Sequence, residues 1–348
     1  MKQMKKLLCG VLMVCMILSG ITVAPQNVQA ATASGNDGEI HWEIKGDTLT
    51  LSAVKGTKGE MKDYESSTSS PWAMSPKLKD VKNIVIDKSV TKIGSFAFAS
   101  TANTISQMRK IDTMKILCKA DVIPEYFIGG PIDAINSIII GGNIKKIEQY
   151  AFPCTNTKTL IIGKNVTQIG EMNFGASFGV DGYATELKSV YGYSNSEASE
   201  FVNFWNKGLA LGNEWFFFDE DGDGVEEEEI LLWRPNENGE NGFSLIDFYS
   251  MTDKNCLSKA KATSSISVNK NKSKTIKVTL PAGFNKVTKY SGSPADVKVT
   301  FKSSNKKVAT VSSSGKVTGK KKGTAKIIVT MQIKDGAKKT ATTKVTVK

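Results

Sequence analysis

The sequence predicts a mainly β protein in which a solenoid of short repeats is followed by a β-sandwich. Three observations support this fold class. One apolar spacing recurs four times between residues 84 and 174, polar and apolar residues alternate again from Thr263 onward, and an acidic stretch without periodicity separates the two regions. At 348 residues, the chain is long enough for two domains of ordinary size.

The repeat is clearest in Asn136–Phe152. Two apolar residues two positions apart fit a short strand with one buried face, a glycine pair ends it, and the apolar step then lengthens to three. One copy follows without a gap, one lies upstream, and another fits if two residues are missing between Cys118 and Ile123. The copies are Ile84, Ile86, Val90, Ile93, Phe96 and Phe98; Ile116, Cys118, Ile123, Tyr126 and Ile128; Ile138, Ile140, Ile144, Ile147, Tyr150 and Phe152; and Leu160, Ile162, Val166, Ile169, Met172 and Phe174.

A single copy has an apolar face and nothing of its own to cover it. Only stacking on neighbouring copies gives a dry core, which is the principle of a solenoid. Short-period β patterns also build parallel β-helices, and that alternative is a solenoid as well.

The segments VTKIGSFAF (Val90–Phe98) and VTQIG (Val166–Gly170) closely resemble BspA-type leucine-rich repeats of bacterial surface proteins. The resemblance covers roughly residues 37–218. It implies a leucine-rich-repeat solenoid with its carboxy-terminal cap over residues 81–218, preceded by a β cap over residues 31–80. Trp42 and Trp72 are expected to be packing residues of that first cap.

Residues 31–80 also show their own local signals. Gly38–Ala53 alternates polar and apolar residues on both sides of Gly46-Asp47, which predicts a β-hairpin. Before this cap, residues 1–30 have the basic start, apolar run and small-residue end of a secretory signal peptide. The mature protein is therefore expected to be exported, and no later stretch is apolar enough to cross a bilayer.

The carboxy-terminal cap is predicted from three short segments. Val190–Tyr193 fits a further strand, Glu197–Trp205 places Phe201, Phe204 and Trp205 on one helical face, and Trp215–Phe218 fits a last strand. Residues 219–262 are interpreted as an acidic insert and linker.

Asp219, Asp221 and Asp223 in this insert reproduce the first half of a calcium loop, in which alternating carboxylates converge on one ion. Glu226 and Ile230 stand where such a loop needs an apolar residue and a bidentate glutamate. Two interpretations stay open, a solvated acidic connector and a weak calcium site. No other cofactor is expected.

Residues 263–348 alternate in the manner of an all-β sandwich. Their pattern closely resembles the signature of group-two bacterial immunoglobulin-like domains, carried by Phe301, Lys302, Ser303, Ser304, Val308, Ala309, Thr310, Val311, Gly315, Val317, Gly319, Gly323, Ala325, Ile327 and Val329. Ala309, Val311, Val317, Ile327 and Val329 are expected in the core. Gly315 suits a tight hairpin.

Charge is divided unevenly along the chain. Residues 257–348 hold 22 lysines and two acidic residues, a formal charge of +20, whereas residues 31–256 hold 21 basic and 32 acidic residues, a charge of −11. Such a cationic module attracts polyanions at low salt, and Lys320, Lys321 and Lys322 are candidate contacts in a polar turn. The alternative is that the lysines serve solubility alone. Sequence-specific nucleic-acid binding is not expected, because arginine is nearly absent.

Catalytic motifs are missing from the sequence. His41 is the only histidine, Cys118, Cys154 and Cys256 are widely spaced, and no GxSxG elbow or phosphate loop is present. Cys118 and Cys154 are expected to fill core positions, since three cysteines form no disulfide framework.

The sequence thus favours a non-enzymatic, monomeric binding or adhesion protein, secreted or held non-covalently at the cell surface, since no LPxTG-like sorting motif is seen. The family resemblance implies host, matrix or cell-wall glycan and protein ligands. A glycan hydrolase with carboxylates that meet only in the fold, and a purely architectural surface protein, are the alternatives.

Overall fold

The computed structural model describes a large part of the chain. It covers residues 33–65, 70–98, 111–128, 132–153, 155–170, 173–174, 176–179, 182–184, 187–211, 216–218, 228–230 and 246–348. Residues 32–348 form one compact unit, and every contact given below lies within it. The expected signal peptide, residues 1–30, and Cys154 lie outside the described residues.

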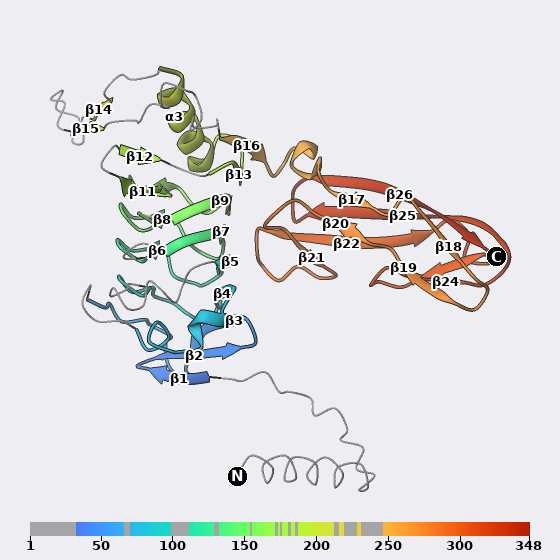
Figure 1. Cartoon of the computed structure of the whole chain (residues 1–348), viewed down its shortest axis with the longest axis horizontal. Helices are drawn as coiled ribbons and strands as arrows, with labels where there is room; N and C mark the ends of the chain where they lie inside the picture. The colour runs from blue at the N-terminus through green and yellow to red at the C-terminus, as the bar shows by residue number, and fades with distance from the viewer. Residues whose placement is uncertain are drawn as a thin grey trace, which may run out of the picture. The chain divides into compact units, whose positions relative to one another are not determined.

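A nine-stranded sheet holds the repeats together (Figure 1). It opens with antiparallel strands β1 (Ala33–Asp37), β2 (Ile40–Lys45) and β3 (Thr48–Ala53), so the expected hairpin is present, with Gly46 at a φ of +63° in its turn. From β3 onward every pairing is parallel, with one strand from each of the four copies and two more strands after them. These strands are β4 (Asn83–Ile86), β5 (Ile111–Ile116), β7 (Ile132–Ile140), β9 (Thr155–Ile162), β13 (Ser189–Gly192) and β16 (Asp247–Ser250).

A second, shorter parallel sheet forms the other wall of the repeats. It consists of β6 (Val122–Ile123), β8 (Lys146–Ile147) and β10 (Gln168–Ile169). One side chain per strand points inward to meet the residues of the long sheet, so the core lies between the two walls. This stacking of copies is the arrangement that the apolar spacing predicts.

The second copy of the repeat differs from the sequence interpretation. Met114 and Ile116, rather than Ile116 and Cys118, lie beside Ile84 and Ile86 of the preceding copy. The whole copy then runs 30 residues after the first without a gap, with Ala120 in place of the valine. The missing pair of residues was an error of register, and Cys118 is a buried residue just beyond the strand.

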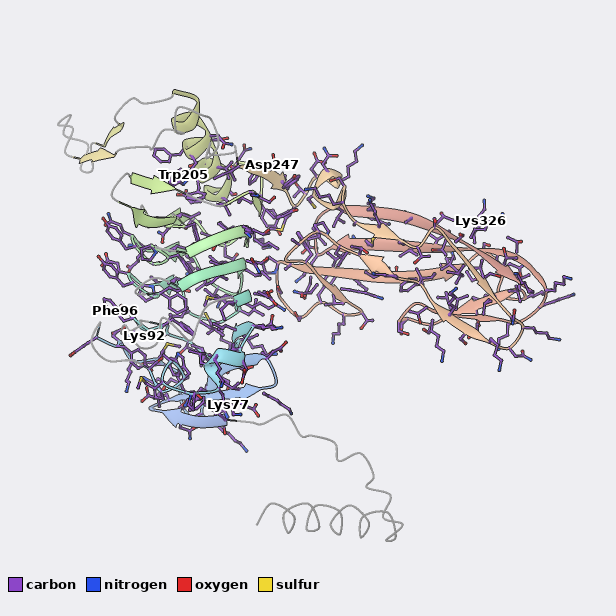
Figure 2. The ribbon with its side chains drawn as sticks, viewed as in Figure 1. Lys77, Lys92, Phe96, Trp205, Asp247 and Lys326 are labelled. Atoms are coloured by element: carbon purple, nitrogen blue, oxygen red, sulfur yellow. The ribbon has the colours of Figure 1, made fainter. Side chains whose placement is uncertain are left out.

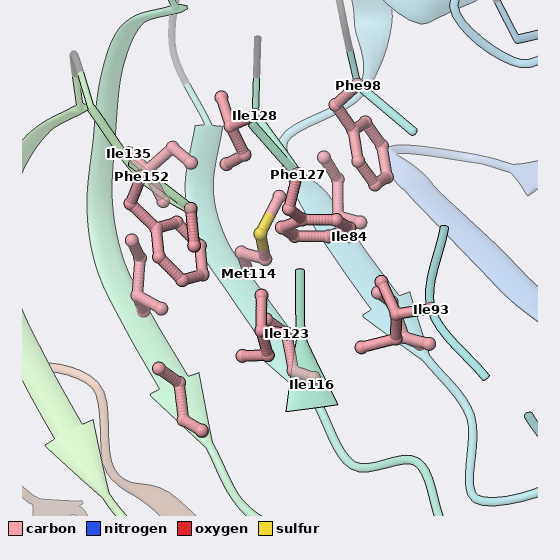
Figure 3. Close-up of a cluster of buried hydrophobic side chains, with 14 of the residues drawn as sticks. Ile84, Ile93, Phe98, Met114, Ile116, Ile123, Phe127, Ile128, Ile135 and Phe152 are labelled. Atoms are coloured by element: carbon pink, nitrogen blue, oxygen red, sulfur yellow. The ribbon is translucent and has the colours of Figure 1, made fainter. Parts of the chain in front are cut away.

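A column of phenylalanine rings runs through the core (Figure 3). Phe98, Phe127, Phe152 and Phe174 follow one another with ring centroids 5.4, 5.7 and 4.9 Å apart. Trp72 of the amino-terminal cap continues the column at 6.2 Å from Phe98. Each ring is fully buried, so the column joins every copy to the next.

Helix α3 (Glu197–Leu211) closes the carboxy-terminal end of the column. Phe201 packs edge-on against Phe174 at 5.8 Å, and Trp205 lies one turn further at 6.3 Å from Phe201. Phe204 was expected on the same face, but its side chain is 39% exposed. A four-residue step keeps Phe201 and Trp205 on one face of the helix, whereas Phe204 turns outward.

The long sheet does not end where the sequence suggested. After α3 the chain forms β14 (Phe216–Phe218), which pairs with β15 (Glu228–Ile230), and then returns as β16, which pairs with β13. The stretch 219–262, interpreted as insert and linker, therefore contains the last strand of the sheet. The acidic run therefore interrupts the long sheet instead of following its last strand.

The remaining short strands are β11 (Ala176–Gly179) and β12 (Gly182–Ala184), paired antiparallel, while η1 (Leu78–Asp80) precedes β4 and η2 (Lys254–Leu257) follows β16. Residues from Met251 to Ala260 already belong to the second hydrophobic core. That core therefore begins earlier than the boundary at residue 263 suggested.

The second module is a β-sandwich. A five-stranded sheet of β18 (Ser265–Val268), β26 (Lys338–Val347), β25 (Gly323–Ile333), β22 (Asp296–Ser303) and β21 (Asn285–Val287) faces β19 (Ser273–Thr275), β24 (Lys316–Gly319) and β23 (Ala309–Val311). A pair of short strands, β17 (Lys261–Ala262) and β20 (Val278–Thr279), completes it. Four of the five expected core residues are fully buried, and Val311 is half-buried. Gly315 has a φ of +89°, as a hairpin glycine requires.

The sandwich packs directly against the outward face of the long sheet. Ile139, Ile161 and Tyr191 point away from the repeat core, yet they are buried with the residues of the second core. Tyr191 meets Phe284 edge-on at 4.9 Å. Beside this apolar contact, the Lys115 ammonium donates a hydrogen bond to the Asn285 amide oxygen at 3.3 Å. The two modules therefore share a core.

The corrected register gives a stability prediction. Met114→Ala should lower the free energy of unfolding by about 2–5 kcal/mol, because it opens a cavity in the stacked core. Thr113→Ala, one residue earlier and half-buried, should change it by about 0.5 kcal/mol or less. Chemical denaturation of both variants measures the difference. Equal effects would contradict the register described here.

Candidate binding surface

Each of three successive copies turns a corner at an aromatic residue. Phe96, Tyr126 and Tyr150 have φ angles of +54°, +50° and +52°, in the left-handed region that side chains seldom adopt. Their backbones are linked from copy to copy, because the Phe96 amide donates to the Tyr126 carbonyl at 3.0 Å and the Tyr126 amide donates to Tyr150 at 2.9 Å. The same corner geometry therefore repeats in register.

The register stacks the three rings into a surface row, called the aromatic row below. Phe96 and Tyr126 have centroids 5.2 Å apart and planes within 6°, and Tyr126 and Tyr150 are 5.6 Å apart and parallel. Tyr126 is 37% exposed, and its neighbours are half-buried. Figure 2 shows Phe96 on the side of the repeats away from the long sheet. These positions belong to the apolar repeat, as predicted, and Phe96 packs against its core, but their rings also reach the surface.

Charged groups border the aromatic row. Lys92 pairs with Asp63 at 2.9 Å and Lys146 pairs with Glu148 at 3.4 Å. Partial burial acts to raise the pKa of Asp63, but the hydrogen bonds from Lys92 and from the Ser95 amide outweigh it and lower that pKa. Glu125 lies beside Tyr126 and its amide donates to the Glu148 carboxylate at 3.3 Å. The row is thus an apolar strip with a polar rim, the composition of many protein interfaces.

The aromatic row has a conformational cost. A non-glycine residue in the left-handed region costs roughly 1–2 kcal/mol. The two stacked ring pairs stabilise the structure by about 0.5–1.5 kcal/mol each beyond the contribution of their burial. Glycine would avoid the cost at every corner. The chain therefore keeps partly exposed rings in a backbone conformation that disfavours them, and such sites deserve a functional test.

The opposite face of the repeats is less open. On the long sheet, the outward positions of β7, β9 and β13 are covered by the sandwich, where even a Cβ atom on Gly283 would lie 2.9 Å from Ile161. Lys115 on β5 is half-buried, and this burial lowers the pKa of its ammonium, while nearby Asp296 opposes the shift. A large ligand therefore finds the aromatic row more accessible than these strands.

Of the two ligand sites predicted from the sequence, the structure describes the lysine turn but not the acidic loop. Lys320, Lys321 and Lys322 are exposed in the turn between β24 and β25, where the first two amides donate to the Val308 carbonyl. Asp219, Asp221 and Asp223 lie outside the described residues, so the structure does not test the calcium hypothesis. Among the residues that are described, no cluster of three or more metal-ligating side chains is present.

Groups that could act in nucleophilic catalysis are kept apart. His41 is bound through Nδ1 to the Asn36 side chain at 2.7 Å, on the surface of the amino-terminal cap. Burial raises the pKa of the Cys118 thiol to about 11, against weaker opposition from backbone hydrogen bonds. Burial, with a smaller contribution from Asp253, raises the pKa of the Cys256 thiol to about 12. Both thiols are therefore protonated at neutral pH and unreactive as nucleophiles.

Comparison with known families supports the two modules. Residues 77–181 match the model of the BspA type leucine rich repeat region in six copies, and residues 262–342 match that of the bacterial Ig-like domain (group 2). Comparison with curated proteins gave no match. The chain therefore contains a BspA-type repeat region followed by a bacterial immunoglobulin-like domain, as the sequence predicted. Both are binding or structural modules typical of bacterial surface or extracellular proteins.

No helix in the part of the chain that the structure describes is both long and apolar enough to span a membrane.

The cysteine environment gives a second prediction. At pH 8 the Cys118 and Cys256 thiols should not react with a disulfide reagent in the folded protein, because on the order of one thiol in a thousand or fewer is ionised at their raised pKa values. Unfolding in guanidinium chloride should restore rapid reaction of both. A Cys154→Ser protein lacking residues 1–30 isolates these two thiols. Rapid reaction under native conditions would contradict their burial.

Proposed function

We propose that this protein is a secreted or surface-held binding protein that carries out no catalysis. The repeat region presents the recognition surface, and the sandwich keeps the protein at the cell surface by docking on an anionic wall polymer. The aromatic row carries the first part of this proposal. A host, matrix or cell-wall glycan or protein is the class of ligand that it would contact.

Two rival functions make different demands on the structure. A purely architectural protein needs no aromatic row at the surface, yet three copies each place a partly exposed ring at the same left-handed corner. A glycan hydrolase needs two carboxyl groups aimed at one bond from roughly 5–10 Å apart. Two carboxylates near the row, those of Asp63 and Glu148, are engaged with lysines on the surface instead. A binding surface accounts for the described features better than either rival.

The retention part of the proposal rests on charge. The +20 of residues 257–348 stands against the −11 of residues 31–256, so an anionic polymer is drawn to the sandwich and repelled from the repeats. The exposed Lys320–Lys322 turn is one possible contact. Monomeric protein suffices for both parts, because the two surfaces lie on different modules.

The third prediction tests the recognition surface. The mature protein is screened on an array of glycans and matrix proteins, and a ligand found there is titrated against Tyr126→Gly. Glycine adopts the corner φ without strain, so the variant removes the ring and leaves the corner intact. Affinity should fall at least about tenfold, about 1.4 kcal/mol, because Tyr126 is the central ring of the row.

Met74→Ser is the matched control. Met74 is a 61% exposed apolar side chain of the amino-terminal cap, outside the row, and its replacement should leave affinity unchanged. Melting temperatures of both variants report on folding. If Tyr126→Gly bound the ligand as tightly as the natural protein, the aromatic row would not be the recognition surface.

A further inference from the structure

The outer face of the five-stranded sheet of the sandwich carries lysines on a regular grid. Most inward positions of β22, β25 and β26 are buried, and their outward positions alternate with them. The outward lysines are Lys298, Lys302, Lys326, Lys338 and Lys344, which we call the lysine face. Figure 2 marks Lys326 on this sheet. Between the lysines lie Thr300, Thr324, Thr330, Thr340, Thr342, Thr346, Gln332 and Ile328.

Like charges on this face stand directly opposite each other. Lys326 of β25 pairs in register with Lys344 of β26, and Lys298 and Lys338 flank Gln332 in a row across three strands. Directly opposed like charges destabilise a sheet. The arrangement therefore favours a ligand that neutralises several ammonium groups at once.

Neutralisation does not come from the described protein itself. The ion pairs within 4.0 Å among the described residues all lie in the amino-terminal cap and the repeats, outside the sandwich. Residues 257–348 hold two acidic residues, of which only Asp296 shares the outward side of β22, two residues before Lys298. Asp296 is buried and accepts hydrogen bonds from Ser291, whereas Asp335 lies in the turn between β25 and β26.

The chemistry of the face identifies the partner. Five flexible ammonium groups among small hydroxyl side chains can follow a chain of phosphates, with threonine hydroxyls as further donors. Tyr290 borders the face, but its ring lies 5.8 Å from the Lys298 ammonium and its hydroxyl donates to the Gln332 carbonyl at 3.0 Å, so it is already engaged within the protein and poorly placed to stack on bases. The face has no arginine fork to read base edges. Ile328 is its one large aliphatic side chain among the described outward residues, which is a poor anchor in a lipid surface.

We infer that the lysine face is the docking site for a linear phosphodiester polymer of the poly(glycerol phosphate) type. This inference rests on the retention part of the proposed function and assigns the main contact to the sheet face instead of the turn at residues 320–322. Charge complementarity supplies the affinity, so binding weakens with salt. The sheet spaces facing residues of neighbouring strands by roughly 5 Å, which lets one polymer segment contact ammonium groups from two strands.

Two charge-matched triple variants of the mature protein test the site. One replaces Lys302, Lys326 and Lys344 by Gln on the face, and the other replaces Lys320, Lys321 and Lys322 by Gln in the turn. Both remove three positive charges from the same module. Binding to poly(glycerol phosphate) is measured by calorimetry at 50 and 200 mM salt, with a neutral polymer of equal length as control.

The face variant should bind at least about tenfold more weakly than the natural protein and show a smaller loss of affinity with salt, because its contacts are removed. The turn variant should bind within about threefold of it. Melting without polymer at low salt adds a second measurement, since Lys326→Gln removes the opposed pair and should keep or raise the melting temperature.

These measurements distinguish a failure of the lysine face from a failure of the proposed surface retention. If the natural protein does not bind the polymer at 50 mM salt, the retention part of the proposed function falls together with this site. If it binds and the turn variant loses as much affinity as the face variant, retention stands and the lysine face is rejected. Tighter binding to vesicles containing half anionic lipid than to the polymer would also reject it, in favour of a membrane surface. The recognition role of the aromatic row is tested separately and survives each of these results.

Discussion

The fold of the repeat region depends on the alignment of apolar side chains from one copy with those of the next, because no copy can bury its own apolar side chains alone. The parallel pairing of strands places Ile84, Met114, Ile138 and Leu160 in one line, and the phenylalanine column makes a second line behind it. A cap is then needed at each end, because the last ring would otherwise meet water. Trp72 and Phe201 occupy these ends. The aromatic row follows the same registration, so the proposed recognition surface depends on the packing that folds the core.

The repeat, the hairpin, the sandwich and most of their core residues could be predicted from the sequence. The spacing of buried residues along a strand or turn can be read from neighbouring positions alone. It misplaced the second copy because Met114, Ile116 and Cys118 are all apolar at two-residue steps, which fits two registers equally well. Only the distance to Ile123 and the small Ala120 decide between them. The pairing of β16 with the long sheet could not be predicted for a similar reason. Four residues that follow a long aperiodic stretch contain no pattern that indicates their partner strand.

The candidate surfaces were harder to predict than the fold. Phe96 and Phe98 are both aromatic and two positions apart, and the sequence alone does not show that the chain turns a corner at the first of them. The contact of the sandwich with the sheet had a visible but ambiguous signal. In the run Ile138–Ile140, the middle residue must point away from the repeat core, and Ile161 and Tyr191 repeat this position. Outward apolar residues on neighbouring copies indicate a covering partner, which here is the next module of the same chain.

This cover gives the sandwich a role beyond that of a spacer. Because Tyr191 and Phe284 share one buried contact, a force on the sandwich reaches the repeat sheet through packed side chains and not only through the connecting segment. The unequal charge of the two modules then has a structural consequence. In the proposed function the cationic module would bind a polyanion through the face of its outer sheet, and the acidic module is held in contact with it by an apolar seam that salt does not screen. The proposed docking would therefore weaken as ionic strength rises, whereas the apolar contact between the two modules would not.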